Sequence, residues 1–355
     1  MKSILTWLAA ALLLAALSPA ATAGTVQVFS EPGFPTADTA PLSDPQLHSL
    51  LPGAAFVDTA HLPAALTPDT TLLVLPYGSA FPEADWPAIH SYLERGGNLL
   101  VLGGRPFTRA AFLDAGVWKL RDPSMRFSSE LLIDQYEQTP SSAGLRFQAN
   151  PDTLLPTPAF SWQRAFSPIL HLSASRLSER GGSAGRIDAR IDALAWGDAN
   201  GRHLAAPAVQ IDHLHARFTG SRWVLLTSDL PPDFASTAGP LLASLVQAAS
   251  HGAQDFHADP EMPLYLPGEP VQLHLRYTAA AEPHAAATAQ VTLSRQGAPG
   301  RPTTLRRDLS ADLSGDPASD LVLTLPPPAS SGLYRIDATL LDHAGHPLAI
   351  AHSGF

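Results

Sequence analysis

The chain has 355 residues, with 22 lysines and arginines against 32 aspartates and glutamates, for a net charge of −10. This acidity argues against nucleic acid or an anionic lipid surface as the partner. The sequence contains no cysteine, which excludes disulfides, every thiol mechanism and every cysteine-based metal site. At about 100 to 200 residues per domain, the length predicts two domains.

The N-terminus has the pattern of a secretory signal peptide. Lys2 precedes an almost entirely apolar run from Ile4 to Leu17, and an A-x-A site ends at Ala23. The apolar run is short for a membrane span, which needs about 20 residues, so a retained anchor is the lesser alternative. We expect cleavage after Ala23 and a mature protein that is secreted or periplasmic, with no membrane attachment.

The first elements alternate between strand and helix. Thr25 to Phe29 alternates as a strand does, Ser43 can cap a short helix that runs through Leu51, and Ala55 to Val57 forms a second strand. This order is typical of an α/β domain.

The stretch from Thr71 to Phe107 is the clearest unit and predicts strand, helix, strand. Its two aliphatic runs, Leu72 to Leu75 and Leu99 to Leu102, lack alternation, as expected for strands buried on both faces of a parallel sheet. Asp85 is a candidate N-cap for the helix between them, and Gly96-Gly97 ends that helix. The short connection predicts parallel strands and a doubly wound, mostly parallel, flavodoxin-like sheet.

The next region is expected to complete this sheet. The patterns predict a short helix at Thr108 to Ala115, followed by an elaboration over the ligand-binding edge at Trp118 to Arg164. Three strands should follow, at Ala189 to Trp196, Ala208 to Ala216 and Arg222 to Ser228. A helix at Ala235 to His251 should cover them.

The composition changes after residue 253. From there to the end, short alternating strands are punctuated by proline and glycine, which predicts an all-β, immunoglobulin-like sandwich. We therefore divide the chain into a signal peptide (1–23), an α/β domain (24–253) and a β-sandwich domain (254–355). The expected sandwich strands are Val271 to Tyr277, Ala289 to Ser294, Asp320 to Leu325 and Tyr334 to Leu340.

Two stretches of the chain resemble known domains. LLVLPYGSAF…DWPAIHSYLERGGNLLVLGG resembles the class I glutamine amidotransferase-like domain found, without catalytic activity, inside secreted bacterial glycoside hydrolases. It is comparable to the trimerisation domain of some β-galactosidases. The tail, LYLPGEPVQLHLRY through SSGLYRIDATLLDHAG, is similar to the immunoglobulin-like module that in such proteins leads into a catalytic (β/α)₈ barrel.

The resemblance departs from active amidotransferases at one turn. Those enzymes carry a cysteine nucleophile after the strand that here ends at Leu102, and this chain has Gly103-Gly104-Arg105 instead. Amidotransferase chemistry is thus excluded. We expect a non-catalytic accessory region, or pseudoenzyme, of a secreted carbohydrate-active protein that serves assembly, spacing or glycan contact.

The resemblance also implies what the chain contacts. The expected partners are carbohydrate or a glycoside hydrolase catalytic domain, together with self-association into a homo-oligomer, and no cofactor is expected. A catalytic barrel needs about 250 further residues, so we expect a truncated or split form of a longer enzyme. The alternative is a self-contained secreted hydrolase that acts on carbohydrate with the acids Asp134 and Asp229.

The best candidate ligand site is a crevice at the carboxyl ends of the central strands. Tyr77 and Gly78 follow one strand, and Gly103, Gly104 and Arg105 follow the next. Glycines there would let a ligand approach backbone N–H groups, and the arginine could hold a carboxylate or pair with Asp134. The alternative is that the glycines only serve the turn and the arginine forms a structural salt bridge.

Other candidates have equally ordinary alternatives. His213 and His215 share one expected strand face at a spacing that can bind a metal, but no third ligand is evident. Ser228-Asp229 ends a buried strand, either as a functional acid or as a routine turn. The acids Glu130, Asp134 and Glu137 form either a catalytic set or a solvated patch. The aromatic residues Tyr136, Phe160 and Trp162 either stack on sugars or cover the sheet edge.

Overall fold

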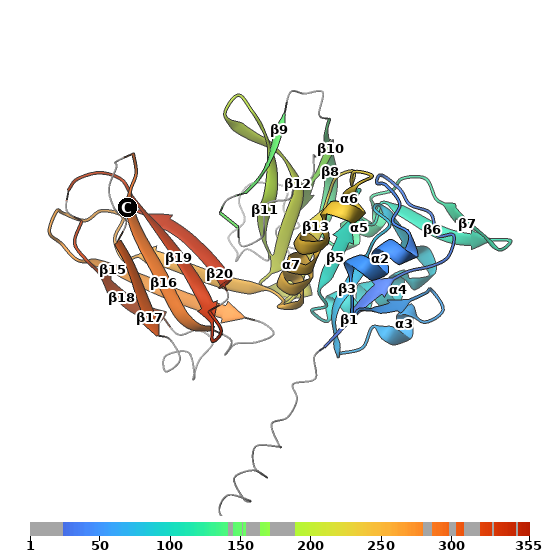
Figure 1. The fold of residues 1–355 in the computed structure, drawn as a ribbon, viewed down its shortest axis with the longest axis horizontal. Coiled ribbons are helices and arrows are strands. Elements are labelled where there is room, and N and C mark those ends of the chain that lie inside the picture. The colour runs from blue at the N-terminus through green and yellow to red at the C-terminus, as the bar shows by residue number, and fades with distance from the viewer. Residues whose placement is uncertain are drawn as a thin grey trace, which may run out of the picture.

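The computed structural model combines a mixed α/β part with a β-sandwich (Figure 1). The predicted signal peptide, residues 1–23, lies outside the described residues. The structure describes residues 24–140, 145–150, 152–153, 164–170, 189–279, 286–297, 303–308, 320–328, 330–345 and 347–355.

An eight-stranded sheet organises the α/β part, in the order β2-β1-β3-β5-β13-β12-β11-β9. Its first five strands are parallel, and β13, β12, β11 and β9 pair antiparallel. The bounds are Ala55–Val57 (β2), Thr25–Phe29 (β1), Thr70–Leu75 (β3), Leu99–Leu102 (β5), Arg222–Leu226 (β13), Arg202–His213 (β12), Ala189–Ala199 (β11) and Arg146–Ala149 (β9).

Helices cover both faces of this sheet. On one face, Leu73 of β3 packs in a core with α3 (Leu62–Ala65) and α4 (Trp86–Glu94). On the other, Val74 packs with α2 (Asp44–Leu50), α6 (Phe234–Thr237) and α7 (Gly239–Ser250). Neighbouring residues of one strand enter opposite cores, which is why the run is aliphatic throughout.

The predicted strand, helix, strand unit is present as β3, α4 and β5. β3 and β5 pair in parallel, with Leu73 opposite Leu99. Asp85 occupies the N-cap position of α4, as predicted, although its side chain makes no capping hydrogen bond. A 3₁₀ turn, η1 (Glu83–Asp85), leads into the helix.

The prediction of a helix at 108–115 is wrong, because this segment forms part of a β-hairpin. Strand β6 (Arg109–Asp114) pairs with β7 (Val117–Leu120) and with β4 (Ala80–Pro82). Ala115 and Gly116 both have positive φ, as in a primed hairpin turn. Pairing with β4, which is distant in sequence, overrides the local helical pattern.

The elaboration expected at 118–164 contains α5 (Arg126–Glu130) and β8 (Ile133–Pro140), and β8 pairs with β10 (Arg164–Leu170). Phe166 of β10 donates its N–H to the carbonyl of Thr227, just beyond β13. β8 and β10 therefore lie at the carboxyl edge of the sheet, whereas β9, from the same segment, is an edge strand of the sheet itself.

Two more predicted elements differ in extent. β11 and β12 are longer than expected and form one antiparallel hairpin whose turn, Asn200-Gly201, has positive φ at both residues. The single helix expected at 235–251 is two helices, α6 and α7, with Ala238 between them.

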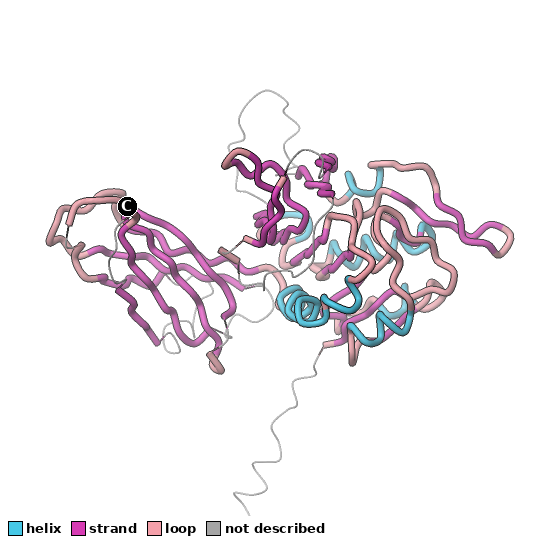
Figure 2. The backbone as a smooth tube through the Cα atoms, turned by 45° about the horizontal axis from the view of Figure 1, so that its top comes forward, coloured by secondary structure: helices cyan, strands magenta, loops and turns pink. Residues whose placement is uncertain are grey.

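The last third of the described chain is a sandwich of two antiparallel sheets, and every described helix belongs to the α/β part (Figure 2). Its core contains Leu273 and Ile336, both fully buried. The sheets run β14-β15-β18 and β17-β16-β19-β20, with bounds Gln254–Pro260 (β14), Val271–Ala279 (β15), Ala286–Arg295 (β16), Thr303–Asp308 (β17), Asp320–Leu325 (β18), Tyr334–Asp342 (β19) and Pro347–Gly354 (β20). Among the described helices, none has the length and apolar character needed to span a bilayer.

Candidate functional site

Neighbouring segments of the chain fill the space around the turn after β5. A side chain at Gly103 would meet the side chain of Thr39, and a Cβ at Gly104 would lie 2.5 Å from the backbone nitrogen of Ser79. Both glycines have positive φ, and the N–H of Gly104 donates to the carbonyl of Ser228 at 2.9 Å. The glycines therefore allow other chain segments to approach closely.

Arg105 is held by an ion pair across the same turn. Its Nη2 lies 2.9 Å from Oδ2 of Asp38, and its backbone N–H donates to Oγ of Ser79 at 2.7 Å. Ser79 in turn donates to Asp38 at 2.6 Å. The carboxylate that pairs with Arg105 is thus Asp38, whereas the sequence had suggested Asp134, which lies on β8.

Tyr77 is enclosed, not open to a crevice. Its ring packs against Phe29 and Phe34, and its hydroxyl accepts a hydrogen bond from the N–H of Glu31 at 3.0 Å. Burial raises the pKa of the Tyr77 hydroxyl. Gly78 forms a parallel bridge with Ala37. The loop after β1 therefore occupies the place where the sequence suggested a ligand.

A second ion pair lies at the end of β13. Asp229 pairs with Arg164 at 2.5 Å, and the guanidinium groups of Arg164 and Arg105 both lie over the ring of Phe166, at 5.5 and 5.3 Å from its centroid. Within the described chain, Oγ of Ser228 and Oδ1 of Asp229 are buried without a hydrogen-bond partner. The described charged groups here are engaged with each other.

Among the candidate acids and aromatic residues, Glu130 and Tyr136 have structural contacts. Glu130 accepts a hydrogen bond from Nε1 of Trp86 at 2.7 Å, and Glu137 lies on β8. Tyr136 donates its hydroxyl to the carbonyl of Pro106 at 3.1 Å, and burial raises its pKa. Tyr136 therefore helps to cover the sheet edge, whereas Phe160 and Trp162 lie outside the described residues.

The two candidate metal ligands do not share a strand face. β12 ends at His213, and His215 is an exposed residue beyond it, so the predicted strand to Ala216 is too long. His213 is 4% exposed and packs against Trp223 at 4.0 Å between ring centroids. Burial lowers its pKa to about 3, so the ring is neutral. Among the described residues, no three His, Cys, Asp or Glu side chains are grouped to hold a metal.

Asp85 is a buried acid that the sequence identified only as a helix cap. Its Oδ2 has no hydrogen-bond partner among the described residues. Burial, together with the charges of Glu31 and Asp58, raises its pKa to about 6. The enclosure of this carboxyl makes its ionisation costly to the folded state.

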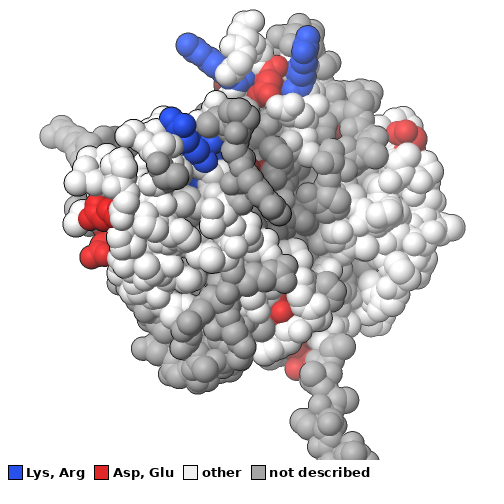
Figure 3. All heavy atoms as spheres, turned by 60° about the vertical axis from the view of Figure 1, so that its left-hand side comes forward, with Lys and Arg blue, Asp and Glu red and all other residues white. Residues whose placement is uncertain are grey.

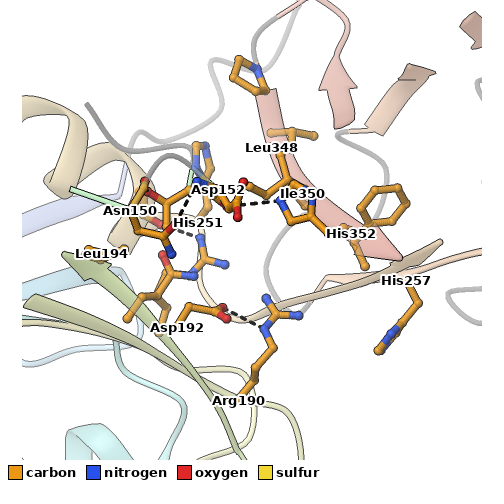
Figure 4. A pocket seen from close by; sticks show the side chains of 18 of the residues that line it. Asn150, Asp152, Arg190, Asp192, Leu194, His251, His257, Leu348, Ile350 and His352 are labelled. Carbon is orange, nitrogen blue, oxygen red and sulfur yellow. Dashed lines mark hydrogen bonds and ion pairs between the residues drawn. The ribbon is translucent and has the colours of Figure 1, made fainter. Parts of the chain in front are cut away.

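A cavity lies where the α/β part meets the sandwich, and the sequence analysis did not predict it. It has a volume of about 620 Å³ (Figure 4). Residues from β11, β12 and α7 line one side, and β14 and β20 line the other. We call it the junction cavity; its wall includes Asn150, Asp152, Arg190, Asp192, Ala248 and His352.

Ion pairs form the α/β wall of the junction cavity, and one of them, between Arg222 and Asp212, is buried. Nε of Arg222 lies 2.6 Å from Oδ1 of Asp212, and both side chains are almost fully buried. Arg190 reaches Asp192 at 2.9 Å, Asp212 at 3.2 Å and Asp255 at 3.5 Å. Burial opposes the charge of Arg190, but the three carboxylates outweigh it and raise the pKa of Arg190. Because β11, β12 and β13 are neighbours, alternate charged residues on them meet on one face.

The sandwich contributes a second cluster of interacting polar and charged side chains. Arg335 lies 2.7 Å from Asp152 and 2.6 Å from Asp337, and Nδ1 of His352 lies 2.7 Å from the same Asp337 carboxylate. The contact between Asp152 and Arg335 joins residues 183 positions apart and links the two parts of the chain. On the described part of the face that Figure 3 turns forward, most of the visible atoms belong to uncharged residues.

Comparison with known proteins returns structural likeness only. No family model matches the chain, and no curated protein matches it. Solved structures that resemble it include β-galactosidases from Bacillus circulans sp. alkalophilus (TM-score 0.37, 8% identity, 86% of this chain and 40% of that one) and from Halorubrum lacusprofundi (0.35, 14%, 93% and 41%). Another is the β-galactosidase from Rahnella sp. R3 (0.34, 10%, 80% and 41%).

The chain spans about two fifths of the length of these enzymes. At such scores the likeness carries no inference about activity. The class that the chain's own geometry defines is a mixed α/β domain followed by a β-sandwich. Its similarity to amidotransferase-like and immunoglobulin-like domains stays a prediction from the sequence.

Proposed function

We propose that the chain is a non-catalytic accessory region of a secreted, carbohydrate-active protein. Carbohydrate enters the proposal from the sequence resemblance to domains of glycoside hydrolases, and the structural neighbours that are β-galactosidases belong to the same class. The α/β part would be an amidotransferase-like, doubly wound domain and the sandwich an immunoglobulin-like module. Their role would be assembly, spacing or glycan contact, in the periplasm or outside the cell.

One observation carries the proposal: the turn after β5 offers no reactive group and no space for one. Gly103 and Gly104 are packed by Thr39 and Ser79, and Arg105 is paired with Asp38. A side chain at Gly103 would meet the side chain of Thr39, and one at Gly104 would meet the backbone of Ser79. At these two glycines the space that a nucleophilic side chain would need is therefore occupied.

The alternative function is a self-contained hydrolase that uses Asp134 and Asp229. Glycoside hydrolysis needs two carboxyl groups on either side of the scissile bond, one of them able to donate a proton. Asp229 is paired with Arg164 at 2.5 Å, an arrangement suited to a structural role. Oδ1 of Asp229 has no hydrogen-bond partner among the described residues, and this keeps the alternative open to test.

Turnover of glycosides by the purified protein decides between the two. We expect no release of nitrophenol from a panel of nitrophenyl glycosides and no reducing sugar from polysaccharide. Asp229→Asn and Asp134→Asn should match the unsubstituted chain. Turnover that either substitution abolishes would establish the hydrolase instead.

A further inference from the structure

We propose that the junction cavity binds a neutral, hydroxyl-rich ligand, an oligosaccharide of two or three units. The choice of carbohydrate rests on the function proposed above, whereas the size and charge of the ligand come from the cavity itself. The inference assigns glycan contact to one place in the chain.

The cavity has the dimensions of a ligand site. Its volume of about 620 Å³ falls within the range of roughly 300 to 1,000 Å³ that is usual for small-molecule pockets. Apolar groups of Leu194, Phe256 and Leu348 alternate with polar ones on its wall. A sugar presents the same mixture, with C–H surfaces between hydroxyl groups.

Three carboxylates on the wall retain free acceptor capacity. Asp152 pairs through Oδ1 with Arg335, Asp192 through Oδ2 with Arg190, and Asp259 through Oδ2 with Arg276, at 2.7, 2.9 and 2.7 Å. Among the described residues, no partner contacts the second oxygen of any of the three. An ionised carboxylate accepts hydrogen bonds only, so these oxygens suit ligand hydroxyl groups, which donate.

The same ion pairs argue for a neutral ligand. Each of these carboxylates already has a guanidinium partner, and Arg222 is paired with buried Asp212. An anion or a cation would have to compete with these pairs. The pairs of Asp152, Asp192 and Asp259 are partly exposed, but separating the buried Arg222–Asp212 pair would be costly. A neutral polyol needs only the unused lone pairs. Figure 4 shows Asp192 beside Arg190, and Asp152 beside His352.

The position of the cavity couples binding to the arrangement of the two parts. Asp192 and Ala248 come from the α/β part, and Asp259 and His352 come from the sandwich. A ligand that contacts both walls adds to the ion pairs between them, Arg335–Asp152 and Arg190–Asp255. Binding should therefore also narrow the spread of orientations between the two parts.

The test compares two substitutions on helix α7. Ala248→Phe places a ring in the junction cavity, whereas Ala243→Phe makes the same change at an exposed position on that helix. Lactose, cellobiose and maltotriose are titrated by calorimetry, with digalacturonate as the charged probe. We expect at least one neutral sugar to bind the unsubstituted chain and Ala243→Phe, with binding lost in Ala248→Phe.

Asp192→Asn is the second variant, used in case Ala248→Phe does not fold. It keeps the shape of the side chain, and Arg190 retains Asp212 and Asp255. Binding should weaken about tenfold, as expected when a hydrogen bond to a charged group is replaced. Small-angle scattering of the unsubstituted chain should show a narrower distance distribution with the sugar than without it.

Several results would overturn the inference. The inference is wrong if no neutral sugar binds, if Ala248→Phe and Asp192→Asn leave sugar binding unchanged, or if digalacturonate is the only probe that binds. Hydrolysis of a bound sugar would contradict the proposed non-catalytic function and leave the cavity assignment intact. Absence of both binding and hydrolysis would overturn the cavity assignment alone.

Discussion

The buried imidazole of His213 makes a quantitative prediction about stability in mild acid. Burial lowers its pKa to about 3 from 6.5. Below pH 6.5 His213 is therefore protonated in the unfolded chain but stays neutral in the folded chain, so the free energy of unfolding falls as the pH falls. This contribution is largely complete near pH 3, where the folded ring also becomes protonated.

The magnitude follows from the size of the shift. Each unit of pKa difference corresponds to 1.36 kcal/mol, so His213 should cost about 2 kcal/mol of unfolding free energy between pH 7 and pH 5. His213→Leu removes the titrating group while keeping an apolar side chain against Trp223. The variant should lack this part of the pH dependence, whatever its stability at pH 7.

Urea unfolding at pH 5 and pH 7, followed by tryptophan fluorescence, measures the difference. Trp223 lies 4.0 Å from the His213 ring and reports on the same core. His48→Leu, a substitution of an exposed histidine on α2, controls for the exchange itself. Equal pH dependence in His213→Leu and the unsubstituted chain would refute the assignment of a buried neutral His213.

Three further predictions concern single contacts. Burial raises the pKa of Asp85, so the unsubstituted chain should lose stability as the pH rises from about 4 to 6. Asp85→Asn should remove this loss and stabilise the protein at pH 7 by about 1 to 2 kcal/mol. Urea unfolding at pH 4 and pH 7 measures both effects. Gly104→Ala should cost about 2 kcal/mol or more in thermal unfolding, since φ is +70° and the new Cβ would meet Ser79; a cost under half of that would count against the close packing. Arg335→Ala should leave the melting temperature nearly unchanged but broaden the scattering distance distribution, because it removes the ion pair to Asp152; an unaltered distribution would show that other contacts set the orientation.

The predicted self-association is a separate matter for light scattering. The sequence resemblance to a trimerisation domain implies a homo-oligomer, which should give a molar mass of at least twice that of the chain at micromolar concentration. A monomer would argue against a role in assembly and leave spacing and glycan contact as the proposed roles.

Local patterns in the sequence were sufficient for the parallel half of the sheet. The aliphatic runs of β3 and β5 and the glycines after α4 are signals carried by neighbouring residues, and the structure confirms these elements together with the coarse division into an α/β part and a β-sandwich. The hairpin of β6 and β7 shows where local signals fail. Its pairing with β4 depends on residues some 30 positions earlier in the chain.

The candidate site depended far more on tertiary structure. The sequence placed Arg105 and the glycines at the correct edge of the sheet, but only the folded chain shows that Asp38 and Thr39 occupy that edge. The junction cavity could not be predicted at all, because Asp152 and Arg335 meet across 183 positions. Strand and helix periodicity is set by near neighbours, whereas the walls of a site between two domains are set by how their surfaces pack.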